Sequence, residues 1–511
     1  MSSRLWSVFV DAFGSTDRSL RLEDLTRRDI YQYTSDKLNG NRQFVKMVNE
    51  ASVYPSLIEE VTQRARGVFL WVYLVVRDLL RGLTNGDSGN LLQSRLEMFP
   101  EDLDEFFRHM ITTIPPMYLQ HTIRLFEIVK SASEPQSAIA LSFVDEVEAE
   151  PDLPQKSLIE RMADSEIQWR FDQIRRRLDA RSKGLLEITS EDSRDSYFRS
   201  RIDFLHRTVY EFLHRSESLG AMSQENRFSN SPSTALVMCK ALVVTLKRAP
   251  GFPIDWEIYS SVFEWARHLN SESESQKKLI NTLREAESVY DEVYPYETSQ
   301  ARAAVVPRFS ELACAYGILL FVESELQNGG YHGTSKHLAL DYALARRTVL
   351  HPGIIKTLLE AEADPNAKIG HFTIFGRFMG SIAVQEQPAA NESIKDVLHL
   401  LLSSGADVNT TVTSRRRVLS SDDGDDGIET LQRRRCLYGE EMWLQYNTSR
   451  AWQVIQDCFP EEDLIDMSDV ARLGVSNPVA ATGKWLHRAK SLLPRKADNS
   501  RRGAQRESWV A

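Results

Sequence analysis

Residues 204–213 read FLHRTVYEFL, and this stretch decides the fold. It is typical of the end of a strand that runs into an amphipathic helix, with His206 at the junction. The amides of a helix N-terminus at such a place can face a phosphate. Upstream, residues 171–186 have the spacing of a helix that enters a strand, and Gly184 separates the two. Together these segments predict a winged-helix-like unit.

The same segments resemble a known protein family. RRRLDARSKGLLE at 175–187, followed by FLHRTV at 204–209, is similar to the fungal NACHT-type signal-transducing NTPases, an NLR-like branch of the STAND class. The resemblance implies that the winged helix packs over a nucleotide site. It also implies that a histidine at the start of one of its helices contacts the bound diphosphate, which makes His206 the candidate. The alternative is a histidine packed at a strand–helix junction without a ligand.

A second resemblance lies at the start of the chain. SSRLW at 2–6 is similar to the sensor strand of this family, in which an arginine just past the strand end reaches the terminal phosphate. Arg4 is the candidate for that role. Leu5 stands where the family usually has proline. The apolar pattern of residues 67–76 also resembles the helical domain that follows the nucleotide core in this family.

A phosphate loop is the element of such an NTPase that the sequence does not show. The loop needs G-x-x-x-x-G-K-[ST], so that backbone amides cradle the phosphates and a hydroxyl holds magnesium. Residues 474–485 have too long a spacing and a tryptophan where the hydroxyl belongs, and residues 329–336 have the wrong order. We therefore expect no catalytic residue and no NTPase activity in the chain as given. ADP or ATP and magnesium are expected only in an intact relative with an upstream phosphate loop.

Composition limits the other possibilities. The formal net charge of -10 argues against general nucleic-acid binding, which depends on clustered Lys and Arg. The four cysteines are too scattered for a disulfide scaffold or a zinc site, so we expect no metal site and a cytoplasmic, reducing compartment. The longest apolar run, residues 68–76, is far short of the roughly twenty residues that a membrane helix needs. No signal peptide is visible.

We expect a mainly α-helical chain of several domains, in line with its length of 511 residues. Blocks of arginine and aspartate between 415 and 435 cannot bury enough apolar surface to order themselves. The expected domains are a remnant of the nucleotide-binding core at 1–45, a helical domain at 46–115, a winged-helix-like domain at 116–220, an α-helical scaffold at 231–330, ankyrin-like repeats at 334–410, a disordered linker at 411–435 and a C-terminal tail with short helices at 436–511.

Two similar phrases indicate the repeats. GIIKTLLEAEADPN at 353–366 and VLHLLLSSGADVN at 397–409 both resemble the second helix and following turn of an ankyrin repeat. Leu358 and Leu401 are 43 residues apart, against about 33 in a regular repeat, which predicts an insertion of about ten residues. Two repeats are fewer than the three normally needed for stability, so we expect them to dock on the helices before them. They then form either a protein-binding surface or a cap.

Two functional hypotheses follow. In the first, the chain is the regulatory and protein-interaction portion of a NACHT/NLR-like signalling protein, with protein partners and possible homo-oligomers. In such a relative, bound ADP holds a closed state and exchange for ATP opens it. In the second, the chain is a free-standing helical and ankyrin-like scaffold without a nucleotide role. A third possibility, a hydrolase in the central helices, has no nucleophile–base pattern to support it.

Overall fold

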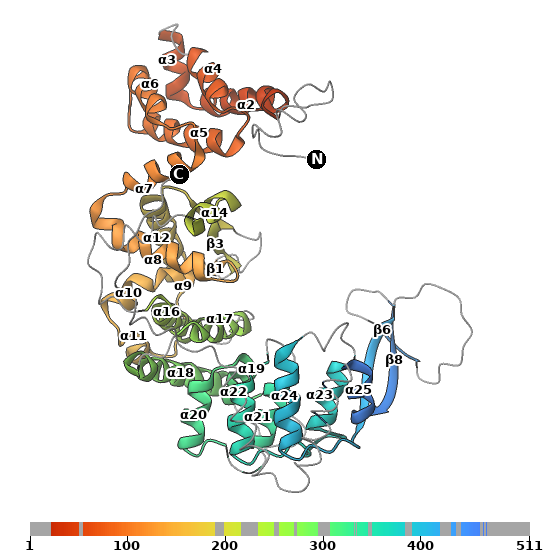
Figure 1. Cartoon of the computed structure of the whole chain (residues 1–511). Coiled ribbons are helices and arrows are strands. Elements are labelled where there is room, and N and C mark those ends of the chain that lie inside the picture. Colours follow the sequence, from red (N-terminus) through yellow and green to blue (C-terminus); the bar gives the residue numbers. More distant parts are fainter. Residues whose placement is uncertain are drawn as a thin grey trace, which may run out of the picture. The chain divides into compact units, whose positions relative to one another are not determined.

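Helices account for most of the chain in the computed structural model, so the prediction of a mainly α-helical fold is confirmed (Figure 1). Contacts divide the chain into two compact units, residues 1–254 and 255–511, which we describe separately. The structure describes residues 22–50, 55–189, 199–215, 233–249, 255–269, 273–294, 307–331, 333, 335–345, 350–383, 391–418, 431–435, 441–459, 463 and 467.

The described part of the first unit begins with an array of five helices, which we call the helical array. Trp71 and Val75 lie in its core because the apolar run that contains them is long enough to be buried on several sides. The Trp71 indole donates to the carbonyl oxygen of Pro100 at 2.7 Å, which satisfies the polar atom of this buried ring. The array consists of α2 (Leu22–Asn39), α3 (Arg42–Glu50), α4 (Pro55–Arg64), α5 (Phe69–Thr84) and α6 (Gly89–Met98).

A connecting helix, α7 (Leu103–Thr112), follows the array. The Asp102 side chain caps it by accepting the Glu105 backbone N–H at 3.0 Å. Phe106 faces Trp71 of the array, with ring centroids 6.3 Å apart. The next residue, Phe107, packs at 5.4 Å on Phe212 in the part of the unit that follows. Helix α7 therefore touches both parts of the first unit.

The second part of the first unit, which we call the sheet domain, surrounds a small antiparallel sheet. The sheet has the order β1-β3-β2, and Ile202 in the central strand is paired with both Gln136 and Ile188. Its elements are α8 (Pro116–Ser131), β1 (Gln136–Ser137), α9 (Ala138–Ser142), α10 (Val144–Ala149), α11 (Leu153–Lys156), α12 (Asp164–Ser182), β2 (Leu186–Thr189), β3 (Arg201–Phe204), α14 (Arg207–Arg215) and α16 (Thr234–Arg248).

Helix α16 belongs to the sheet domain, and not to the scaffold expected at 231–330. Every residue of this helix from Ala235 to Lys247 is buried, because it packs against α8, α9, α10 and α11. The Lys240 ammonium donates to the carbonyl oxygen of Pro151 at 2.6 Å. The boundary between the units falls after Ile254. A helix that is apolar on all sides needs neighbours on all sides, and here the preceding domain supplies them.

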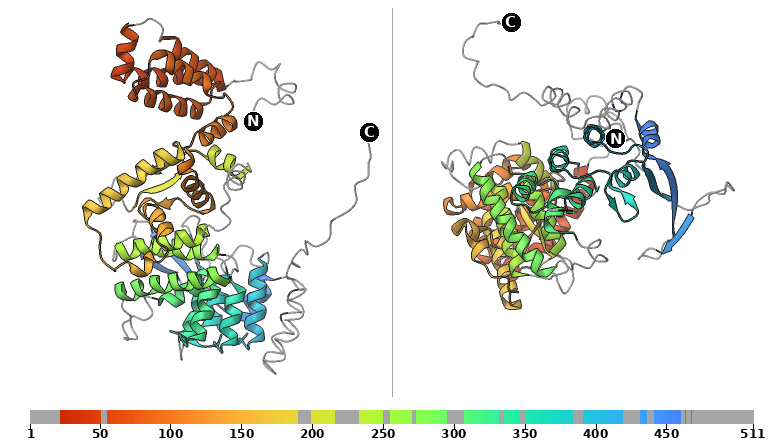
Figure 2. Two further views of the ribbon diagram at one scale, coloured as in Figure 1. Left: turned by 90° about the vertical axis from the view of Figure 1, so that its left-hand side faces the viewer. Right: turned by 90° about the horizontal axis from the view of Figure 1, so that it is seen from below.

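The second unit starts with two long helices and continues as a series of helix pairs, which lie side by side in Figures 1 and 2. One apolar core runs through the pairs, from Cys314 to Met467. The elements are α17 (Asp255–Arg267), α18 (Ser273–Val293), α19 (Phe309–Tyr316), α20 (Leu319–Gln327), α21 (Ser335–Leu344), α22 (Pro352–Glu360), β4 (Lys368–Ile369), β5 (Phe372–Thr373), α23 (Ile374–Ile382), α24 (Glu392–Ser403), β6 (Thr411–Val418), β7 (Leu431–Arg435), β8 (Glu441–Arg450) and α25 (Ala451–Cys458).

The helix pairs end in equivalent turns. After α20, α22 and α24, a backbone N–H bonds back to the fifth residue before it. The bonds are Gly330 to Glu325 at 2.7 Å, Ala363 to Leu358 at 3.0 Å and Ala406 to Leu401 at 3.0 Å. The residue before each donor is left-handed, with φ of 72° at Gly329, 63° at Glu362 and 84° at Gly405. The first two turns are 33 residues apart and the next two 43, so the pattern begins at α19–α20, upstream of the expected start at 334.

A β-hairpin follows α24, as a shorter one follows α22. In the preceding turn, the Ile374 N–H bonds to the carbonyl oxygen of Ala367 and closes the short β4–β5 hairpin. The Ala451 N–H bonds in the same way to Thr410 at 3.0 Å, and it closes the longer β6–β8 hairpin. The linker expected at 411–435 therefore contains strands β6 and β7. Strand β8 lies between β6 and β7 and pairs with both. It supplies the backbone hydrogen bonds that the local composition does not predict.

The Asn366 side chain joins two neighbouring turns. Its amide donates to the carbonyl oxygen of Gly405 at 2.8 Å, and its oxygen accepts the Asp407 N–H at 2.7 Å. We expect Asn366→Ala to destabilise the second unit by about 1–2 kcal/mol, because both backbone groups lose a partner. Urea unfolding followed by hydrogen exchange of α22 and α24 measures this. The control is Asn409→Ala, because Asn409 is the equivalent residue in the turn that follows α24. An equal loss of stability in this variant would contradict the role of Asn366 in joining the two turns.

Candidate functional site at the strand–helix junction

The candidate site lies where β3 passes into α14. The Leu205 N–H bonds to the carbonyl oxygen of Leu185 at 3.0 Å, which ties this junction to the start of β2. The apolar residues Val209, Phe212 and Leu213 bury one face of α14. His206 is exposed immediately before the first residue of the helix. The sequence thus places the imidazole at the positive end of a helix held firmly against the sheet domain.

The His206 imidazole caps the helix. Its Nδ1 accepts the backbone N–H of Thr208 at 3.1 Å and lies 2.9 Å from the Thr208 hydroxyl oxygen. A backbone N–H can only donate, so Nδ1 is the acceptor, and the proton of the neutral ring is assigned to Nε2. The imidazole therefore presents one N–H donor, and the cap fixes the orientation of the ring. An imidazole held in this way suits an anion such as a phosphate group.

Other polar side chains of α14 contact groups of the same helix. Arg207 pairs with Glu211 at 2.9 Å, one helical turn away. His214 stacks on Tyr210 with ring centroids 3.9 Å apart, and its Nδ1 lies 3.0 Å from the Tyr210 carbonyl oxygen. Arg4, the other predicted nucleotide contact, lies outside the described residues. Of the two predicted site residues, the structure therefore places His206 alone.

Sequence reasoning missed Arg77. This residue of α5 reaches the turn between α12 and β2. Its guanidinium donates to the carbonyl oxygens of Gly184 at 3.0 Å and Lys183 at 2.5 Å, where α12 ends. In the sequence it is only the residue that terminates an apolar run. No local signal predicts that its partner lies more than one hundred positions later.

A second cluster holds the helices of the sheet domain together. The Asp145 carboxylate accepts two hydrogen bonds from Arg181, at 2.8 and 2.7 Å, and lies 3.4 Å from Arg177 and 3.3 Å from His121 Nδ1. Burial alone would raise the pKa of the Asp145 carboxyl, but the hydrogen bonds and charge of Arg181, with Arg177 and His121, lower it below its usual value. The cluster links α8, α10 and α12.

This cluster also contains potential metal ligands. His121, Asp145 and Glu148 each place one ligand atom within 4.8 Å of the others. Both carboxylates already bind arginines, because Arg124 bonds to Glu148 at 2.8 Å in the way that Arg181 bonds to Asp145. A metal ion would have to displace these cations, so the donor set fits an ion-pair network better than a metal centre.

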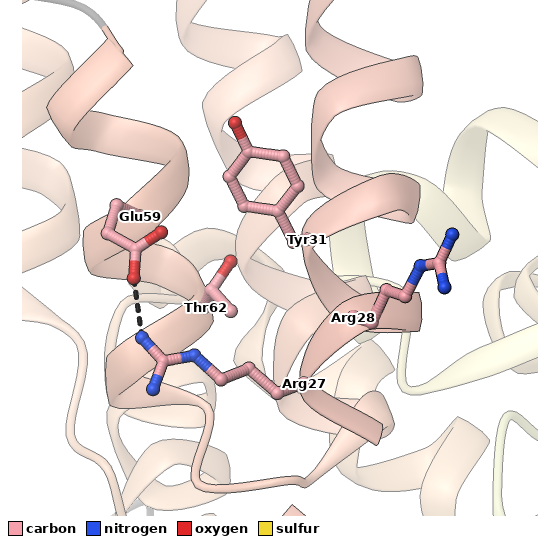
Figure 3. A pocket seen from close by; sticks show the side chains of 5 residues that line it. All are labelled: Arg27, Arg28, Tyr31, Glu59 and Thr62. Atoms are coloured by element: carbon pink, nitrogen blue, oxygen red, sulfur yellow. Dashed lines mark hydrogen bonds and ion pairs between the residues drawn. The ribbon is translucent and has the colours of Figure 1, made fainter. Parts of the chain in front are cut away.

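A shallow hollow lies between α2 and α4 of the helical array. Figure 3 shows Arg27 reaching Glu59 across it, at 2.6 Å, while Arg28 points away from this pair. Tyr31 and Thr62 complete the lining. Both charged partners are more than half exposed, with side-chain exposures of 61% and 51%. The hollow therefore offers one solvated ion pair and no group of converging side chains.

Two carboxyl groups of the second unit, Glu287, which is partly buried, and Asp341, which is buried, have raised pKa values. Burial, with the neighbouring Glu325 and Asp291, raises the pKa of Glu287 to about 7, although Arg284 opposes this. Burial likewise raises the pKa of Asp341 to about 6, although Arg377 bonds to it at 2.7 Å. In both groups the folded state binds the proton more tightly than the unfolded chain does.

The second unit should therefore be more stable at pH 5.5 than at pH 8. A carboxyl group whose pKa is raised by folding contributes stability at a pH below its unfolded-state pKa. This contribution is lost as the pH rises to the folded-state pKa, which for Glu287 means from about 4.5 to 7. We expect Glu287→Gln to increase the stability of the second unit at pH 8 by about 1 kcal/mol. The stability of this variant should also depend less on pH. Hydrogen exchange of α18 against pH measures it. A pH dependence of Glu287→Gln equal to that of the parent would contradict the assignment.

Comparisons with known proteins give one match. Residues 113–252 match a family model described as a domain of unknown function, DUF7791. This range runs from the residues before α8 to those after α16, so it coincides with the sheet domain, including its last helix. Neither the curated proteins nor the solved structures gave a match. Among the described helices, none has the length and apolar character to cross a membrane.

Proposed function

We propose that this chain is the regulatory and protein-interaction portion of a NACHT/NLR-like signalling protein. The observation that carries this proposal is the His206 junction: a ring oriented by its own helix cap presents an Nε2 donor at the positive end of α14. The order β1-β3-β2, with α8, α9 and α12 before the last two strands, supports a winged-helix-like domain around it. The resemblance at 175–187 and 204–209 supplies the diphosphate as the ligand.

The chain's own residues would act by binding and by positioning. His206 would donate to a phosphate oxygen of ADP held by a neighbouring nucleotide core, which would stabilise a closed state. A ligand that contacts both parts in only one arrangement shifts the equilibrium by its differential affinity. Hydrolysis is not assigned to this chain, because no phosphate loop is present in its sequence.

The helix pairs of the second unit support an ankyrin-like interaction surface. Their turns recur first at the ankyrin period of 33 residues and then at 43. With α19–α20 included, three pairs share one core, which meets the usual requirement for a stable stack. The expected ligand is a protein partner, and homo-oligomers remain part of the proposal. We place the protein in the cytoplasm, where a buried thiol such as that of Cys314 stays reduced.

Fluorescent ADP binding tests the role of His206. We expect weak, magnesium-independent binding of mant-ADP to the chain, and a loss of at least about tenfold in affinity in His206→Ala, which is the worth of one hydrogen bond to a charged group. His214→Ala is the matched control, because this exposed histidine lies on the same helix. Equal binding by parent and His206→Ala would exclude the sensor role. Tight magnesium-dependent ATP binding would reveal a phosphate site elsewhere.

The second candidate function is a free-standing helical and ankyrin-like scaffold. The continuous apolar core of the second unit favours it, because this core involves no nucleotide. Absence of mant-ADP binding in both the parent and His206→Ala, with an intact fold, would favour the scaffold. His206 would then be a helix cap only.

A further inference from the structure

Arg77 is a polar link between the helical array and the sheet domain. It projects from α5 and donates to two carbonyl oxygens at the end of α12, those of Gly184 and Lys183. The guanidinium also lies over the Tyr73 ring, 5.6 Å from its centroid. One planar cation thus contacts its own helix and the end of a helix in the other domain.

The end of α12 is shaped to receive a cation. Lys183 and Gly184 both have left-handed backbones, with φ of 52° and 79°, so the chain turns sharply and exposes its last carbonyls. These carbonyls carry the partial negative charge of the helix C-terminus. Burial lowers the pKa of Arg77, and the nearby Arg81 lowers it further. Among the described residues no carboxylate forms an ion pair with Arg77.

The fit is close on the side of Gly184. A Cβ atom placed there would lie 1.9 Å from Arg77 Nη1, so any other residue at this position would require the guanidinium to move. The residue after Gly184 is Leu185, whose carbonyl oxygen accepts the Leu205 N–H. A continuous run of contacts therefore leads from Arg77, through the start of β2, to the residue before His206.

We propose that Arg77 is an interdomain latch that fixes the angle between the helical array and the sheet domain, and with it the position of His206 relative to α5. Helix α7 is the pivot, because Phe106 packs on the array and Phe107 packs on α14. A partly buried cation held by carbonyl dipoles, as Arg77 is, contributes little net stability, since desolvation offsets its attraction, but it defines orientation. In the proposed function, this contact would set the position of His206. The contact itself needs no nucleotide.

A distance measurement between the domains tests the latch. Spin labels at Ser94→Cys in α6 and Ser165→Cys in α12, in a background with Cys436→Ser and Cys458→Ser, report the angle by double electron–electron resonance. We expect one narrow distance distribution in the parent. Arg77→Ala and Arg77→Met should each broaden it at least twofold, while hydrogen exchange within α5 and α8 stays unchanged. Arg77→Lys should restore it in part, because an ammonium reaches one carbonyl at a time.

The matched control is Arg81→Ala, one turn along the same helix. Arg81 approaches Asp179 of α12 at 3.6 Å, with both side chains solvated, so its loss should leave the distribution narrow. A narrow distribution in both Arg77 variants would overturn the latch, as would unfolding of both, because unfolding would assign the guanidinium to stability. Neither result depends on mant-ADP binding, so failure of the latch and failure of the nucleotide role are separate outcomes.

Discussion

Gly184→Ala should destabilise the first unit by about 3 kcal/mol, because left-handed backbone strain of about 1–2 kcal/mol combines with overpacking against the Arg77 guanidinium, which costs about 1–3 kcal/mol. The glycine has φ of 79°, and an added Cβ would overlap the Arg77 guanidinium. Arg77 would have to leave the carbonyls of Lys183 and Gly184 and take its charge back to solvent. Urea unfolding, followed by hydrogen exchange of peptides from α12 and β2, measures the loss.

Gly86→Ala separates the two contributions. Gly86 has a similar backbone, with φ of 85°, but no atom lies within 4 Å of an added Cβ. We expect this control to cost about 1 kcal/mol, from backbone strain alone. Equal losses at the two glycines would show that the guanidinium moves aside freely, and would contradict the close fit at Gly184.

The elements that sequence predicts best are those with strong local periodicity. Residues 204–213 were expected to join a strand to a helix, and β3 ends at Phe204 while α14 begins at Arg207. Gly184 was expected to separate a helix from a strand, and it lies between α12 and β2. The phrases at 353–366 and 397–409 contain most of α22 and much of α24, with the turns that follow. In each case apolar spacing and a glycine or turn residue act within a few positions.

The features that sequence did not predict depend on distant partners. The α19–α20 pair was missed because Glu325 and Gly330 stand where the later turns have Leu358 and Ala363. The backbone bond is the same, but the side chains that identify a repeat differ. Strand β6 depends on β8, more than twenty residues later, for its hydrogen bonds. At the candidate site, His206 was predicted from its local junction, whereas Arg77 and its carbonyl partners are far apart in sequence.

Asp145→Ala should destabilise the sheet domain by about 3 kcal/mol, the usual cost of removing one member of a buried ion-pair cluster. The substitution leaves Arg181 and Arg177, both largely buried, without the carboxylate they share. His121 loses the same partner. We expect earlier unfolding in urea, with increased hydrogen exchange in α8, α10 and α12 and little change in the second unit.

Acid should reproduce the effect of Asp145→Ala in the parent protein. The pKa of Asp145 is lowered in the folded state, so its contribution is present above the ordinary carboxyl value near 4 and is lost as the pH falls below it. This pH range lies below the range of about 4.5 to 7, in which the second unit gains stability as the pH falls. The control is Glu59→Gln, which breaks the solvated pair with Arg27 and should change stability by less than about 1 kcal/mol. If Asp145→Ala behaved like this control, the cluster would contribute no more than a surface ion pair. The helices of the sheet domain would then be held by their apolar core alone.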